Sequence, residues 1–386
     1  MKSLSKNFGK ALLAGSIIFM ASCSKDDKAD DNSNNPNVTP KSTTVKGVLE
    51  SESQFSLMNE AVERSGQADF FANASANITL FAANNDAFED LFAKVGVSSM
   101  TELQSQLGNE AFADIILYHA INGKFNLADF SDGFVETNAQ NENGSRLALL
   151  IKNDNNARLL LNGNNDNGAS TVGNTTLSAE NGSVIEIDGI LDAQTTVENI
   201  EDRGNEENTF MLDLLANADA SVMAMLNNES SDNTVLVASQ NEIESMLSIN
   251  LESILDVEDI EELLDANQKS TLLSNFGVSV ISELMADLTL DDLLNLNVTT
   301  SQIFAVMEED DNTELMNTLI FDGDYTSDDM ISDGSVTSRS GITFDVTSNS
   351  SGNLVLTDSD GNNVILESQS IQSVNGSVFT VTEVQK

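Results

Sequence analysis

The chain is poor in the residues that most often carry chemistry. Its 386 residues include one cysteine, one histidine, two tyrosines and no tryptophan. With Cys23 as the only thiol and His119 as the only imidazole, the chain forms no internal disulfide and no zinc site built from Cys and His. Groups for nucleophilic and acid–base catalysis are equally scarce, and few aromatic rings are available to hold sugars in a glycosidase. We therefore expect no catalytic residue and no enzymatic activity.

Basic residues are also scarce. Lys and Arg together number 17 against 62 Asp and Glu, which gives a formal net charge of -45. A field of that sign repels nucleic acid and anionic membrane surfaces. Cations, or basic patches on other proteins, are the compatible partners.

The N-terminus has the order of charge and apolar residues found in a secretory signal. Lys2, Lys6 and Lys10 precede an apolar stretch that runs from residue 11 to residue 21. At about 1.5 Å per residue in a helix, this stretch is shorter than the hydrocarbon core of about 30 Å. We expect residues 1–22 to be a signal peptide that is removed after export.

The residues that follow point to a lipid anchor. Met20-Ala21-Ser22-Cys23 resembles the lipobox of bacterial lipoproteins, with Met20 where Leu is commoner, and the alternative for Cys23 is a buried core thiol. Residues 24–28 resemble the tag that carries lipoproteins of Bacteroidota-type bacteria to the outer face of the outer membrane, although they also fit the start of a polar tether. Residues 23–44 are too polar to bury a core. The resemblance implies an outer-membrane, surface-exposed protein whose lipid is its one membrane contact.

The remainder is long enough for two domains and repeats itself. One repeated segment reads as a buried strand that leads into a helix, another as a closing strand after a Gly turn, and a third as a short Ser-Asp-Gly run. The paired segments are 79–88 with 234–243, 181–187 with 375–381, and 131–133 with 332–334. Within the first copy, helical patterns come first and strand patterns follow. This order predicts an α+β fold.

Helix signals are clearest in the first copy. Asn85 fits an N-cap, and Ser99 with Glu102 resembles a capping box. His119 falls on one helical face with apolar residues, which predicts a hydrogen-bonded core histidine.

Three segments of the first copy, residues 45–193, resemble a fasciclin (FAS1) domain. They are Thr79–Phe88, Tyr118-His119 with a later Gly123, and Asn181–Leu191, in that order; Ala83 stands where the family usually has Pro. The residues that carry the family motif are Thr79, Phe81, Asn85, Asp86, Phe88, Asn181, Gly182, Asp188 and Gly189. The resemblance implies helices packed against short β-sheets.

The second copy, residues 208–386, follows an expected linker at 194–207 and is a poorer match. It keeps the opening and closing segments but has no Tyr-His pair, and residues of helical pattern at about 247–315 indicate an insertion. We interpret it as a divergent fasciclin-like domain, with an unrelated α+β domain as the alternative.

The resemblance implies function as well as fold. Fasciclin domains are surface modules associated with adhesion and with protein or glycan contacts, and their Tyr-His region is associated with partner binding. Tyr118 and His119 therefore mark the expected partner-binding region. The leading hypothesis is a surface-displayed adhesion or binding protein; the alternatives are a glycan-capture accessory of an outer-membrane uptake system and a passive envelope protein.

Two loops rich in Asn and Asp raise calcium as a candidate ligand. They span residues 162–168 and 358–363. Hard cations take oxygen ligands, but neither loop has EF-hand spacing, because Gln369 stands where a bidentate Glu is needed. Both loops are more simply hairpin turns. We expect no cofactor, with calcium as the alternative.

Overall fold

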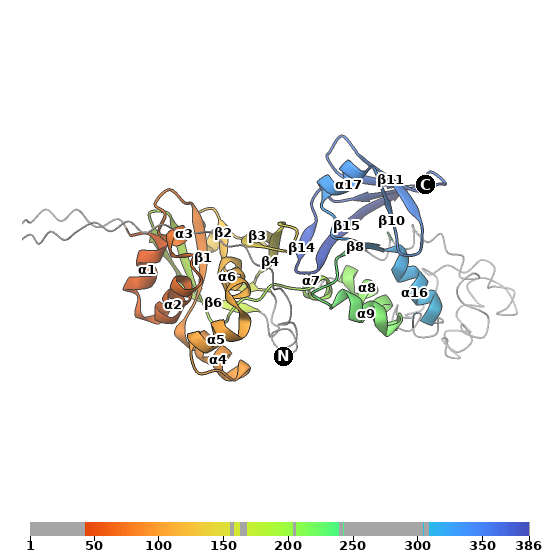
Figure 1. Ribbon diagram of the computed structural model, residues 1–386. Coiled ribbons are helices and arrows are strands. Elements are labelled where there is room, and N and C mark those ends of the chain that lie inside the picture. The colour runs from red at the N-terminus through yellow and green to blue at the C-terminus, as the bar shows by residue number, and fades with distance from the viewer. Residues whose placement is uncertain are drawn as a thin grey trace, which may run out of the picture.

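The computed structural model describes residues 43–154, 158–162, 168–203, 206–238, 242, 304 and 309–385. These residues form two lobes side by side, each with its own hydrophobic core (Figure 1). The expected signal peptide, the lipidation site Cys23 and most of the expected insertion lie outside the described residues. No helix within the described ranges combines the length and the apolar character needed to cross a bilayer.

The first domain places its helices before most of its strands. Its helices are α1 Val45–Ser51, α2 Ser56–Arg64, α3 Ala68–Ala72, α4 Asn85–Val95, α5 Met100–Leu107 and α6 Asn109–Tyr118, with short 3-10 helices η1 Ser53–Phe55 and η2 Leu127–Asp129. Each α-helix turns an apolar stripe inward, as Met58, Ala61 and Val62 of α2 do. Gly96 ends α4 in the left-handed conformation, with φ +78°.

The N-cap of α4 differs from the prediction by one residue. Asn84, not Asn85, is the cap, because its Oδ1 accepts the N–H of Ala87 at 3.0 Å. Asn85 instead is the first residue of α4, and its side chain binds the segment that contains η1 and α2. Its Oδ1 accepts the N–H of Leu57 and its Nδ2 donates to the carbonyl of Ser53, both at 3.0 Å. Both asparagines suit a cap, and the tertiary contact decides between them.

The cap of α5 is confirmed only in part. Ser99 is the N-cap and accepts the N–H of Glu102 at 3.3 Å. The carboxylate of Glu102 reaches the N–H of Ser98 at 2.7 Å rather than that of Ser99, so the reciprocal half of the capping box is displaced by one residue.

The strands of the first domain close into a barrel in sequence order. They are β1 Ile78–Ala83, β2 Ala120–Asn122, β3 Gly133–Gln140, β4 Arg146–Asn153, β5 Leu159–Leu161, β6 Ala169–Ala179 and β7 Gly182–Ile187. The barrel closes where β7 pairs with β1 in parallel, from Ile78 opposite Gly182 to Ala83 opposite Ile187. Every residue of β1 is buried, so this pair lies at the centre of the domain.

The second domain repeats this plan. Its helices are α7 Thr196–Arg203, α8 Glu206–Asn217, α9 Ala220–Leu226, α16 Glu309–Thr318 and α17 Ser327–Asp333. Its strands are β8 Asn233–Val237, β9 Ile320–Asp322, β10 Ser335–Thr337, β11 Thr343–Ser348, β12 Leu354–Thr357, β13 Asn363–Leu366, β14 Ile371–Ser373 and β15 Gly376–Gln385. The sheet order is β10-β11-β12-β13-β15-β8-β9, with β14 beside β15, and β8 pairs with β15 in parallel as β1 does with β7.

Two expected boundaries of the second domain change. Residues 196–203 of the expected linker form α7, whose Val197 and Ile200 lie in the second core. The polar composition of this segment concealed a helix that buries only a few apolar residues. Residues 309–315, expected in the insertion, belong to α16, which leads directly into β9 as α6 leads into β2.

A buried threonine makes the same two hydrogen bonds in each domain. Thr79 Oγ1 donates to the carbonyl of Gly123 at 2.8 Å and accepts the N–H of Phe125 at 2.9 Å. The second domain repeats both bonds, at 2.7 and 2.9 Å, through Thr234, Gly323 and Tyr325.

A buried asparagine joins the first helix to the closing turn in each domain. Asn181 Oδ1 accepts the N–H of Val45 at 2.7 Å, and its Nδ2 donates to the carbonyls of Phe71 and Asn73. The second domain repeats this set through Asn375, Thr196, Leu226 and Asn228. Because unrelated folds do not share such bonds at matching positions, the alternative of an unrelated second domain is wrong. The chain has tandem α+β domains of one design.

The glycine that starts each closing strand leaves no room for a side chain. A Cβ at Gly376, whose φ is +137°, would lie 1.7 Å from the carbonyl oxygen of Asn233. We expect Gly376→Ala to lower the free energy of unfolding of the second domain by about 3 kcal/mol or more. The control Gly352→Ala, at φ +85° with no atom within 4 Å, should cost about 1 kcal/mol. Urea unfolding measures both, and equal losses would contradict the steric argument.

Candidate functional site

The two residues that mark the expected partner-binding region are buried. Tyr118 ends α6 and His119 follows it, and their relative exposures are 1% and 0%. Neither side chain reaches the surface, so a partner that binds in this region would contact residues around the pair and not the pair itself. The helical face that they share with apolar residues directs both inward.

His119 is a neutral structural residue. Its Nε2 accepts the N–H of Leu191 at 3.0 Å, so the ring proton lies on Nδ1, which donates to the carbonyl of Ile115 at 2.8 Å. Burial lowers its pKa from 6.5 to about 4, against the opposing effect of the Ile115 carbonyl. His119 thereby joins the end of α6 to the segment that leaves the first domain.

The Tyr118 side chain is hydrogen-bonded to strand β4 of the barrel and to Asn162. Its hydroxyl donates to the carbonyl of Ala148 at 2.6 Å and accepts from Nδ2 of Asn162 at 3.1 Å. Asn162 has φ +53°, is fully buried, and accepts the N–H of Leu150 through Oδ1 at 3.2 Å. Burial raises the pKa of Tyr118, so its hydroxyl stays protonated. The Tyr118 network therefore fixes strand β4.

The other motif residues are structural as well. Phe81 and Phe88 are core residues, and Thr79 and Asn181 make the bonds described above. Asp188 accepts the N–H of Ser170 at 2.6 Å and pairs with Arg158 at 3.3 Å. A Cβ at Gly189 would lie 2.8 Å from the carbonyl oxygen of Gly168. Asp86 is an exposed residue in the first turn of α4.

The expected calcium loops are described in part. Residues 163–167 of the first loop lie outside the described residues. In the second loop, Oδ1 of Asp358 accepts the N–H groups of Asp360 and Asn362, both at 2.9 Å, which makes a turn closed by its own side chain. Among the residues that the structure describes, no three His, Cys, Asp or Glu side chains are grouped so as to hold a metal ion.

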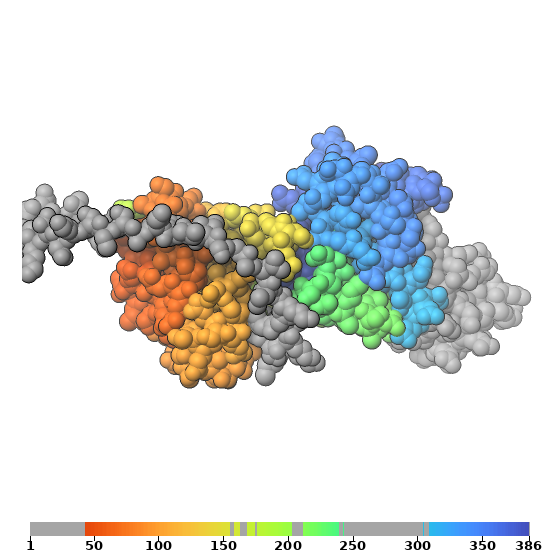
Figure 2. Space-filling view, viewed as in Figure 1, coloured from red at the N-terminus to blue at the C-terminus, as the bar shows by residue number. Residues whose placement is uncertain are grey.

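The two domains meet along β4. Leu147, Leu149 and Ile151 point into the first core, which places the alternate residues on the outer face of the strand. On that outer face Ala148 and Leu150 are still only 6% and 3% exposed, although they belong to neither core. Residues of β14 and α7 pack against β4 and cover them, and Figure 2 shows the yellow part of the first lobe against the second.

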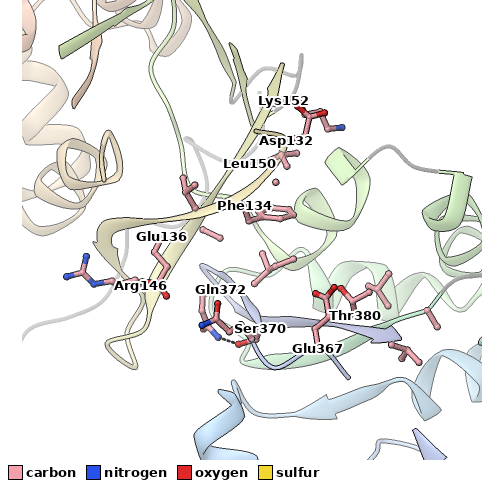
Figure 3. A pocket seen from close by; sticks show the side chains of 18 of the residues that line it. Asp132, Phe134, Glu136, Arg146, Leu150, Lys152, Glu367, Ser370, Gln372 and Thr380 are labelled. Atoms are coloured by element: carbon pink, nitrogen blue, oxygen red, sulfur yellow. Dashed lines mark hydrogen bonds between the residues drawn. The ribbon is translucent and has the colours of Figure 1, made fainter. Parts of the chain in front are cut away.

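A groove of about 660 Å³ opens beside this contact. In Figure 3 the ribbons of β3 and β4 form one wall, with Phe134 directed toward the opposite wall from the second domain. The residues that define it are Phe134, Glu136, Leu150, Glu367, Ile371 and Thr380. The sequence analysis missed this groove because it arises between domains. The unbroken apolar run from Leu147 to Ile151 is the available signal, since it indicates a strand buried on both faces.

Hydrogen bonds join the tip of the β3–β4 hairpin of the first domain to the second domain. Oδ2 of Asp324 in the second domain accepts from Nδ2 of Asn141 at 2.8 Å and from Nδ2 of Asn143 at 3.2 Å. Burial raises the pKa of Asp324, and the two amide donors oppose this rise. Farther along β4, Lys152 Nζ donates to the backbone carbonyl of Asp202 in α7.

Comparison with known proteins identifies the first domain. Residues 53–193 match the family model of the fasciclin domain. No curated protein matches the chain. Among solved structures, the chain is similar to a FAS1 domain pair from the insect cell adhesion molecule fasciclin I, with 13% sequence identity and a TM-score of 0.45 over 85% of this chain and 95% of that one.

The buried neutral histidine predicts a pH dependence of stability. His119 has a pKa of about 4 when folded, against 6.5 as its usual value. As pH falls below 6.5 only the unfolded state binds the proton, so stability present above pH 6.5 is lost toward pH 4. We expect a loss of about 2 kcal/mol between pH 7 and pH 5 from this residue. The variant His119→Gln, compared by urea unfolding at both pH values, should lack that loss; an unchanged pH dependence would show that His119 does not cause it.

Proposed function

We propose that this chain is a lipid-anchored adhesion or binding protein displayed outside the cytoplasm. The observation that carries the proposal is the match of residues 53–193 to the fasciclin domain, a module associated with cell adhesion. The second domain, which repeats the buried Thr and Asn bonds of the first, extends the binding part to a pair of packed domains. The partner is a protein or glycan ligand at the cell surface.

The N-terminal sequence supports the anchor. The basic and apolar order of residues 1–22, followed by Cys23 after two small residues, fits export and lipidation. In this proposal residues 23–44 are a tether, and a polar chain of about 20 residues reaches roughly 25 Å on average, which is enough to hold the domains clear of the lipid headgroups. In this proposal the lipid is the only contact with the outer membrane.

Glycan capture is the second candidate, and the volume of the groove between the domains is compatible with a small ligand. Its volume of about 660 Å³ lies in the range of about 300–1,000 Å³ that is usual for small-ligand sites. A passive envelope protein would have no use for such a site.

The anchor is tested by removing the only thiol. We expect the wild-type chain to incorporate radiolabelled palmitate and to fractionate with membranes, and Cys23→Ala to lose both properties, because no other thiol can take the lipid. Ser24→Ala, which changes the adjacent residue and keeps the thiol, is the matched control. If the wild-type chain takes up no labelled palmitate and fractionates with cytosolic contents, the proposal of a lipid anchor is wrong.

Adhesion is tested in a strain that lacks the protein. We expect surface attachment and cell–cell aggregation to fall in the deletion strain and to return with the wild-type chain but not with Cys23→Ala, since adhesion needs display. Growth on polysaccharides as sole carbon source is measured beside it. A growth defect limited to particular polysaccharides, with attachment unchanged, would replace adhesion by glycan capture.

A further inference from the structure

We propose that the groove between the domains binds an extended basic segment of a partner protein, with a Lys or Arg side chain held between Glu136 and Glu367 beside the ring of Phe134. This inference deepens the proposed binding function and rests on it. It names the chemistry of the partner and the residues that would recognise it.

The first wall offers an aromatic ring and a carboxylate on one face. In the β3–β4 ladder Phe134 lies opposite Leu150 and Glu136 lies opposite Ala148. Leu150 and Ala148 are on the outer face of β4, so Phe134 and Glu136 are on the outer face of β3. The two β4 residues are buried under the second domain, whereas Phe134 is half-buried and Glu136 is exposed. The pair therefore lies where the covered surface opens to solvent.

The second wall offers matching groups from the end of the chain. Glu367 follows β13 and is exposed, while Ile371 of β14 and Thr380 of β15 are half-buried. The backbone N–H of Glu367 donates to the carbonyl of Thr380 at 2.9 Å, which fixes the position of Glu367 on the rim. Figure 3 shows Glu367 and Thr380 across the groove from Phe134.

The groove carries more negative than positive charge, because the carboxylates of Asp132, Glu136, Glu242 and Glu367 line it against the cations of Arg146 and Lys152. Arg146 donates to the carbonyl of Thr137 and to Oδ1 of Asn138, and Lys152 donates to the carbonyl of Asp202, so both cations are already engaged. Glu136 and Glu367 are exposed, and within the described part of the chain neither carboxylate has a hydrogen-bond or ion-pair partner. A cationic side chain bound here would gain from these carboxylates.

The same features distinguish a basic peptide from a neutral glycan. Among the residues that the structure describes, Phe134 is the one aromatic that lines the groove, and the two carboxylates gain little from an uncharged ligand. The net charge of -45 also raises the local concentration of basic partners and repels acidic ones. The observations therefore favour a protein segment that carries Lys or Arg.

The test uses the purified chain and fluorescent hexapeptides of lysine, glutamate and glycine, together with neutral cello-oligosaccharides. We expect hexalysine to bind and the other probes not to bind. Glu136→Gln and Glu367→Gln should each weaken hexalysine binding by about 3-fold, as expected for partly exposed charge pairs. The double variant should weaken it by about 10-fold, and Phe134→Ala should also weaken it. Binding should fall as salt is raised.

The matched controls are Glu89→Gln in the first domain and Glu314→Gln in the second. Both remove one exposed carboxylate outside the groove and leave the net charge equal to that of the test variants. Equal losses in test and control variants would overturn the site, because binding would then follow total charge alone. Cello-oligosaccharide binding that depends on Phe134 while hexalysine does not bind would overturn the basic class of partner. Either failure leaves the palmitate and adhesion results unaffected, so the inference and the proposed function fail separately.

Discussion

Each domain depends on one parallel pairing between its first and last long strands. Residues at the two ends of a domain, such as Ile78 and Gly182, must meet across more than a hundred residues of intervening chain. The close approach at the start of that pair requires a glycine, and the buried Asn181 or Asn375 supplies the bonds that the turn and the first helix would otherwise lack. Because unpaired buried amides are costly, these residues are needed for the barrel to close in the first domain and for the matching sheet to form in the second.

Tyr118 and His119 hold in place two segments that lie next to the second domain. Tyr118 binds the carbonyl of Ala148 directly, and its partner Asn162 binds the N–H of Leu150. The outer face of this part of β4 is the surface on which the second domain rests. His119 fixes the backbone at Leu191, where the chain leaves for that domain. The pair thus fixes the backbone of the strand on which the second domain packs and of the segment that leads to that domain.

The sequence was sufficient for the features that local chemistry controls. The α+β order, the repeated closing segments and the core histidine could all be predicted, because periodicity and turn residues carry them. The choice between Asn84 and Asn85 could not, since both suit a cap and only the contact with Leu57 separates them. Helix α7 was missed because few of its residues are apolar. The groove was missed because it is formed by strands from two domains, and no single segment encodes it.

Hydrogen bonds between the start of the first domain and its closing turn determine how the domain resists a pulling force. The N–H of Glu180 donates to the carbonyl of Thr43, and Asn181 binds the N–H of Val45, so the incoming chain is fastened beside the closing strand. If the proposed anchor and a bound partner pull on the chain in opposite directions, the tension enters at these bonds and leaves past Leu191, which His119 holds. The pulling force would act on hydrogen bonds that join distant parts of the sequence. The helices between these parts would stay folded until those hydrogen bonds break.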